Sequence, residues 1–288
     1  MKRATSLIVL ALALLIAVAF LIRREPREEI PKRSPRRSPV TDASPSEGSP
    51  PPVAVKPSVS APVVVAPAAA GAALPGTVRG LVKIKGEVPR RKIVKLDADP
   101  KCQSFHAGVV LSDELVVDAG GNVQWAFVYV KSGPIGHPPP APTTPVLMDQ
   151  VACTFVPHMV GVRVGQPLRV LSSDDLLHNV HGLTFLNKEF NVGLPTAGME
   201  VVRSFGRPEV MFLIKCDVHP WMRSWVGVMD HPYFAVTNEL GSYVIRELPP
   251  GKYTVEAWHE KYVPLPLQIE VPSGGDVRLD FLLDAQRQ

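Results

Sequence analysis

Three residues whose side chains bind metals are equally spaced on one short stretch, "LIKCDVHPWMRSW" (213–225): Cys216, His219 and Met222. Thiolate and thioether sulfur are soft ligands that suit Cu(I), whereas imidazole suits both oxidation states of copper. Zinc sites use cysteine, histidine and carboxylates, so a methionine in the set favours copper over zinc. The spacing predicts a copper site that a second histidine completes. The competing interpretation is an ordinary loop with a buried cysteine, a surface histidine and a core methionine.

The segment "DDLLHNVHG" (174–182) offers the missing histidine. It follows "QPLRVLSS", a run typical of a β-strand. In an extended chain alternate side chains point to opposite faces, so His178 and His181 cannot both point at one ion. We expect only one of them to be a ligand.

"LLHNVHG" followed by "KCDVHPWMRSWVGV" resembles the cupredoxins, the blue copper proteins of the amicyanin and plastocyanin type, over about Val146 to Asp230. Such a protein holds one type 1 copper ion with two imidazoles, one thiolate and a long, weak bond from a thioether. The resemblance implies that His178, Cys216 and His219 are the strong ligands. It implies that Met222 is the weak axial ligand.

The same resemblance implies roles for the neighbours of these ligands. The backbone of Asn179 is expected to help hold the thiolate, and His181 is expected to be a non-ligand. His219 is expected to have its ring edge near the surface and to serve as the electron port. Pro220 and Trp221 would then form part of the docking face for a redox partner.

Two further cysteines remain if Cys216 binds the metal. In an exported protein a disulfide between Cys102 and Cys153 is the ordinary expectation. The alternative is a second site for zinc or copper, because "KCQSFH" and "ACTFVPH" together supply two cysteines and two histidines: Cys102, His106, Cys153 and His158.

The N-terminus is apolar and then rich in proline. Residues 4–22 carry no charge, and a helix of this length spans about 28 Å, close to the thickness of a bilayer core. We interpret 1–22 as a transmembrane signal-anchor; a cleaved signal peptide ending near Ala17–Val18–Ala19 is the alternative. Residues 23–75 are interpreted as a disordered, Pro-rich linker. Their arginines and lysines favour a cytoplasmic body, which conflicts with export.

The remainder of the chain is predicted to be all-β. Short runs rich in Val, Ile, Phe and Tyr alternate with Gly, Pro and Asn, which is typical of sandwiches and barrels. We predict a cupredoxin Greek-key sandwich at 144–230 and a second, small sandwich. The segment 231–288, with "GSYVIRELPPGKYTVEA", resembles the second half of a carboxypeptidase-regulatory-like (transthyretin-like) domain. Its first half is proposed to come from 77–143; the alternative is two consecutive domains.

The charge distribution argues against binding of nucleic acids. Residues 1–37 carry nine Lys/Arg and three Asp/Glu, whereas 38–288 carry 22 Lys/Arg and 24 Asp/Glu. A nucleic-acid site needs basic residues gathered on a folded face. The part expected to fold is nearly neutral.

These patterns predict a membrane-tethered copper protein of the cell envelope or extracellular face that carries single electrons between redox proteins. Because all four proposed copper positions are filled by protein, we expect neither an enzyme nor a small-molecule substrate. One alternative is a non-redox protein that binds or delivers copper. Another is a structural or adhesion module with a vestigial metal site.

Overall fold

The computed structural model describes residues 73–96 and 99–284, and this part of the chain is all-β as predicted. Its one helix, α2 (Pro100–Ser104), has five residues. The expected signal-anchor and residues 23–72 of the expected linker lie outside the described residues. Within the described ranges, no helix is long and apolar enough to cross a membrane.

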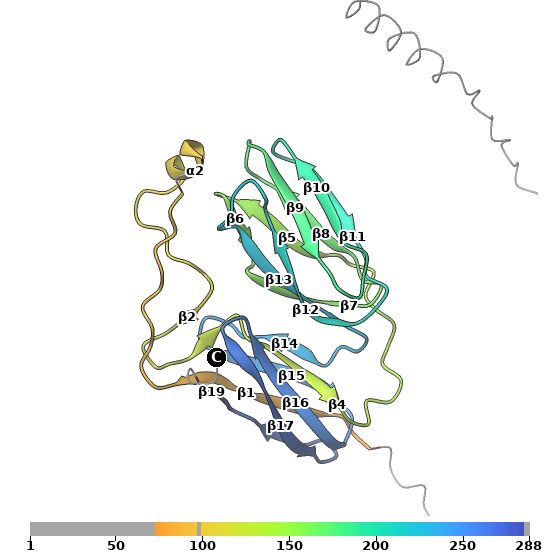
Figure 1. Ribbon diagram of the computed structural model, residues 1–288. Coiled ribbons are helices and arrows are strands. Elements are labelled where there is room, and N and C mark those ends of the chain that lie inside the picture. The colour runs from red at the N-terminus through yellow and green to blue at the C-terminus, as the bar shows by residue number, and fades with distance from the viewer. Residues whose placement is uncertain (1–72, 97–98, 285–288) are drawn as a thin grey trace, which may run out of the picture. The chain divides into compact units, whose positions relative to one another are not determined.

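Nine consecutive strands form a two-sheet sandwich, here called the central sandwich (Figure 1). One sheet has the order β10-β9-β12-β13-β7 and the other the order β11-β8-β5-β6. Apolar side chains from both sheets fill the space between them. The strands are β5 (Val146–Val151), β6 (Thr154–Val156), β7 (Met159–Arg163), β8 (Leu168–Ser172), β9 (His178–Leu183), β10 (Phe190–Leu194), β11 (Glu200–Arg203), β12 (Glu209–Lys215) and β13 (Arg223–Met229).

Strands from both sides of this segment form a second sandwich, here called the flanking sandwich. In one sheet β1 pairs with β15, β18 and β19, and the other has the order β14-β4-β16-β17. The antiparallel pairs β1–β15 and β4–β16 join residues before the central sandwich to residues after it. The strands are β1 (Gly76–Lys85), β4 (Phe127–Ser132), β14 (Phe234–Val236), β15 (Ser242–Leu248), β16 (Gly251–His259), β17 (Tyr262–Val271), β18 (Asp276–Arg278) and β19 (Phe281–Asp284).

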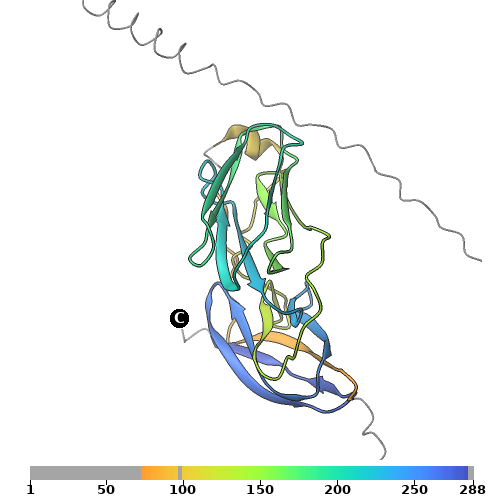
Figure 2. The same ribbon diagram turned by 90° about the vertical axis from the view of Figure 1, so that its right-hand side faces the viewer.

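The two sandwiches lie end to end (Figure 2). A third apolar cluster lies where they meet. Phe127 of β4 packs there with Met159 of β7 and Met229 of β13. Gly161 and Gly227 admit this contact, because a Cβ atom at either position would collide with the ring of Phe127. The absence of a side chain lets the sheet backbone and the aromatic ring approach closely.

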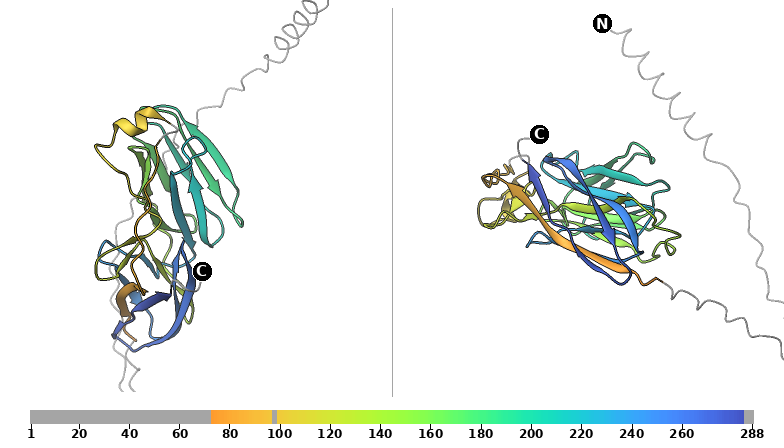
Figure 3. Two further views of the ribbon diagram at one scale, coloured as in Figure 1. Left: turned by 60° about the vertical axis from the view of Figure 1, so that its left-hand side comes forward. Right: turned by 90° about the horizontal axis from the view of Figure 1, so that it is seen from below.

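The segment between β1 and β4 belongs to neither sandwich over most of its length. It contains α2 and the short pair β2 (Val116–Val117) and β3 (Val123–Gln124). We call residues 91–96 and 99–112 the cap, because they reach the end of the central sandwich where α2 lies (Figure 3). A bridge between Ile93 and Leu111 joins its two arms, and Leu96 is buried in the core of the central sandwich.

Candidate metal centre

Neighbouring strands bring the predicted ligands to one end of the central sandwich. His178 is the first residue of β9, Cys216 follows β12, and Met222 precedes β13. β12 lies between β9 and β13, and Lys215 is paired with His181. His178 therefore lies beside the loop that carries Cys216 and His219.

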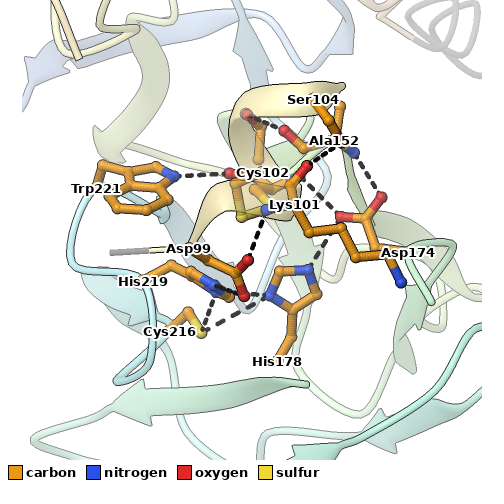
Figure 4. The surroundings of a disulfide bond; sticks show 12 residues. Asp99, Lys101, Cys102, Ser104, Ala152, Asp174, His178, Cys216, His219 and Trp221 are labelled. Carbon is orange, nitrogen blue, oxygen red and sulfur yellow. Dashed lines mark hydrogen bonds and ion pairs between the residues drawn. A yellow bond between two sulfur atoms is a disulfide. The ribbon is translucent and has the colours of Figure 1, made fainter. Parts of the chain in front are cut away.

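Three of the predicted ligands converge on one buried point (Figure 4). The Nδ1 atoms of His178 and His219 lie 3.0 Å apart. The Sγ atom of Cys216 lies 4.0 Å from Nδ1 of His178 and 3.7 Å from Nδ1 of His219. All three residues are at most 1% exposed.

These distances fit a single ion held by all three side chains. Metal bonds of about 2 Å to imidazole nitrogen and about 2.3 Å to a thiolate hold neighbouring ligand atoms about 3–4 Å apart. The three donor atoms already lie in that range. Cys216 is the one free cysteine of the described residues, so its sulfur is available as a ligand.

Met222 is held near Cys216 by the backbone of its own loop. The amide of Cys216 donates to the carbonyl of Met222 at 3.1 Å, and the amide of Met222 donates to the carbonyl of His219 at 2.9 Å. The Met222 side chain is 1% exposed and belongs to the core of the central sandwich. Its axial role stays a prediction.

Asp174 fixes the orientation of the His178 ring. Its Oδ2 atom lies 2.9 Å from Nε2 of His178, and its two oxygens accept the amides of Ala152 and Cys153, each at 2.7 Å. An ionised carboxylate only accepts hydrogen bonds, so Nε2 carries the proton. The lone pair is then on Nδ1, which faces Cys216. This carboxylate–histidine arrangement is typical of the surroundings of metal ligands.

A polar cluster beside the site ties β9 to the Cys216 loop. The side-chain oxygen of Asn179 accepts the amide of Asp217 at 2.7 Å, a contact beyond the backbone role expected for Asn179. His181 lies away from the three donor atoms and is paired with Glu189 and Asp217, each at 2.9 Å. The hydrogen bond to Glu189, with a further one to Asp217, raises the pKa of His181. Hydrogen bonds from Lys215 and His181 lower the pKa of Asp217.

The expected exposure of His219 is wrong. Its side chain is fully buried, because the cap covers it, and Asp99 at the start of the cap helix has Oδ2 at 3.8 Å from Nε2. Burial, together with the neighbouring His178, lowers the pKa of His219 and favours the neutral ring that a metal requires. Trp221 is half-buried, and its ring centroid lies 5.2 Å from that of His219.

The predicted disulfide is present and lies against this site. Cys102 of the cap is bonded to Cys153 in the turn between β5 and β6. The alternative Cys2His2 site is not assembled, because His106 donates to the carbonyl of Ala152 and His158 is paired with Glu260. The sulfurs of Cys102 and Cys153 instead lie within 4.8 Å of a ring nitrogen of His219.

A second histidine cluster lies between the two sandwiches, and no sequence motif marks it. His158 Nε2 lies 2.5 Å from Glu260 Oε1, and both side chains are buried. His259 is 2% exposed, and burial lowers its pKa to about 3, with the charges of His158 and Lys261 acting in the same direction. His158 and Glu260 are 102 residues apart in the sequence. A local sequence pattern therefore could not have predicted this contact.

No protein-family model and no curated protein matches the chain. Solved cupredoxin structures are similar to part of it. A copper-containing nitrite reductase from Thermus scotoductus has 20% identity and a TM-score of 0.28, over 30% of this chain and 22% of that one. A purple cupredoxin from Nitrosopumilus maritimus has 20% identity and a TM-score of 0.25, over 28% of this chain and 97% of that one.

An amicyanin variant in its Cu(I) form has 20% identity and a TM-score of 0.27, over 35% of this chain and 97% of that one. The chain thus spans about a fifth of the nitrite reductase. Likenesses at this level carry no functional assignment, and neither does the carboxypeptidase-regulatory-like resemblance, which stays a prediction.

Proposed function

We propose that this protein holds one type 1 copper ion and carries single electrons between redox partner proteins. His178, Cys216 and His219 would be its strong ligands, and Met222 its weak axial ligand. The observation that supports this most strongly is the convergence of two imidazole nitrogens and one cysteine sulfur within 3.0–4.0 Å in a buried site.

The donor set suits an ion that changes oxidation state without rearrangement. Sulfur stabilises Cu(I), imidazole accepts both states, and a copper ion in this set would supply one-electron transfer. Asp174, the Asn179 tether and the core around Met222 hold the side chains in place before metal binds. Four protein donors would leave no coordination position for a substrate, so we infer a carrier rather than an enzyme.

Electrons would reach the site beside Trp221 rather than through an exposed His219. Trp221 is half-buried and stands next to the exposed Pro220, and both line a surface pocket with Arg223. Its ring is in contact distance of the buried His219 ring. We propose that the redox partner docks over this pocket. Tethering by residues 1–22 and location in the cell envelope belong to the same proposal.

The test is the absorption spectrum of the full chain loaded with Cu(II), followed by voltammetry. We expect an intense thiolate-to-copper band near the red end of the visible spectrum and reversible one-electron cycling. Cys216→Ser should abolish the band. His181→Gln, on β9 with His178 but away from the three donor atoms, is the control and should keep it.

Two outcomes would contradict the proposal. Copper binding without the band would exclude a type 1 site. A band without reversible cycling would favour copper storage or delivery over electron transfer.

A further inference from the structure

A second set of metal-binding atoms adjoins the proposed copper site. One ligand atom each from Cys102, Cys153 and His219 lie within 4.8 Å of one another, and all three residues are fully buried. While Cys102 and Cys153 are joined by a disulfide, their sulfurs cannot act as thiolate ligands. In a chain whose disulfide has not yet formed, the same two positions carry thiols.

His219 has a ring nitrogen that its proposed role does not use. Its Nδ1 faces His178 and Cys216. Its Nε2 is buried without a hydrogen-bond partner, and its nearest carboxylate oxygen, on Asp99, lies 3.8 Å away. A buried polar atom without a partner is uncommon in folded proteins and points to an unseen ligand.

Contacts other than the disulfide hold both cysteines in place. On the cap, Lys101 donates to the carbonyl of Asp175, and His106 donates to that of Ala152 at 2.9 Å. On the other side, Cys153 donates its amide to Asp174 at 2.7 Å and accepts Trp221 Nε1–H at 3.0 Å. The two thiols of a reduced chain would therefore stay close to His219.

We propose that the reduced chain binds a second Cu(I) ion through Cys102, Cys153 and Nε2 of His219. Two thiolates and one imidazole nitrogen form a soft set that selects Cu(I), and binding releases the two thiol protons. When Nδ1 of His219 also holds the first ion, Nε2 loses its proton as well and the ring bridges the two ions as an imidazolate. Formation of the Cys102–Cys153 disulfide closes this site. In that reaction an external disulfide accepts two electrons from the two sulfurs and its own S–S bond breaks. The Cys102–Cys153 bond forms and the Cu(I) ion leaves.

This order of events makes the site a point of entry for copper during maturation. The ion would sit on one side of His219 while the other side of the same ring faces Cys216. The inference shares His219 with the proposed function but depends on two different sulfurs. The two ideas can therefore fail separately.

The experiment is an anaerobic titration of the full-length apo chain with Cu(I) against a coloured Cu(I) chelator. The chain pretreated with a dithiol reductant should bind two Cu(I) ions, and the disulfide form should bind one. Cys102→Ser should lower the reduced chain to one ion. Gln103→Ser, at the exposed neighbouring position, should leave it at two. Equal stoichiometry in the reduced and disulfide forms of the natural sequence would overturn the inference.

Cys216→Ser separates this inference from the proposed function. The reduced variant should still bind one ion and its disulfide form none, whatever the spectrum of the natural sequence shows. X-ray absorption on that reduced variant should show two sulfur ligands on copper, and any other sulfur count would contradict the assignment. Tryptophan emission checks folding; if Cys102→Ser unfolds, the Cys102→Ala/Cys153→Ala pair, which keeps both sites apolar, provides the same test.

Discussion

Two pairs of buried histidines in this molecule have opposite surroundings. His178 and His219 turn their Nδ1 atoms toward each other at 3.0 Å, with a cysteine sulfur beside them. His158, at the junction of the sandwiches, instead has a carboxylate oxygen of Glu260 at 2.5 Å, and His259 Nδ1 accepts the amide of Lys261 at 3.2 Å.

The difference lies in the partners of the ring nitrogens, since burial is common to both pairs. The Nδ1 lone pairs of the first pair converge beside a sulfur and gain most from a shared cation. In the second pair His158 is already paired with a carboxylate, and the Nδ1 lone pair of His259 already accepts an amide. We therefore expect the first pair to govern copper binding and the second to govern stability. Three predictions test this division.

The largest expected effect comes from His158→Ala. It leaves the buried carboxylate of Glu260 without its partner, and breaking a buried pair on one side costs about 3–5 kcal/mol. Urea unfolding should show that the free energy of unfolding falls by this amount, and the copper spectrum should be unchanged. The exposed His137→Ala is the control and should have little effect. Loss of the copper band in His158→Ala would contradict the division.

Asp174→Ala should act on the other pair. It removes the hydrogen-bond partner of His178 Nε2, and loss of such a partner lowers metal affinity about 10–100-fold. Chelator competition measures the affinity. Asp175→Ala, on the exposed next residue, should change it much less. Equal effects of the two substitutions would show that Asp174 does not position the ligand.

The third effect is a pH dependence from His259. Its pKa is about 3 in the folded protein against an ordinary 6.5, so below pH 6.5 the unfolded chain binds a proton that the folded chain does not. Its contribution to stability is complete above about pH 6.5 and falls by about 1.4 kcal/mol per pH unit as the pH drops toward 3.

Urea unfolding of the apo chain at pH 7 and pH 5 measures this loss. His259→Gln should flatten the dependence, and His137→Gln should leave it unchanged. If His259→Gln keeps the full slope, other groups are responsible for it.

The local sequence was sufficient for the features that depend on short separations. The loop from Cys216 to Met222 closes on itself through backbone hydrogen bonds, so its spacing alone keeps these residues together. Strand alternation separates His178 from His181, as their different partners show. The all-β class follows from the apolar runs and the turn residues between them.

Only the tertiary structure decided which of these side chains are exposed to solvent and which contact each other. The cap that buries His219 comes from more than 100 residues earlier in the chain, and Glu260 lies 102 residues from His158. The pairs β1–β15 and β4–β16 span the whole central sandwich. The hydrophobic periodicity of a segment indicates its secondary structure, but it does not identify the distant residues that the segment contacts. The candidate ligands could therefore be proposed from sequence, whereas their enclosure could not.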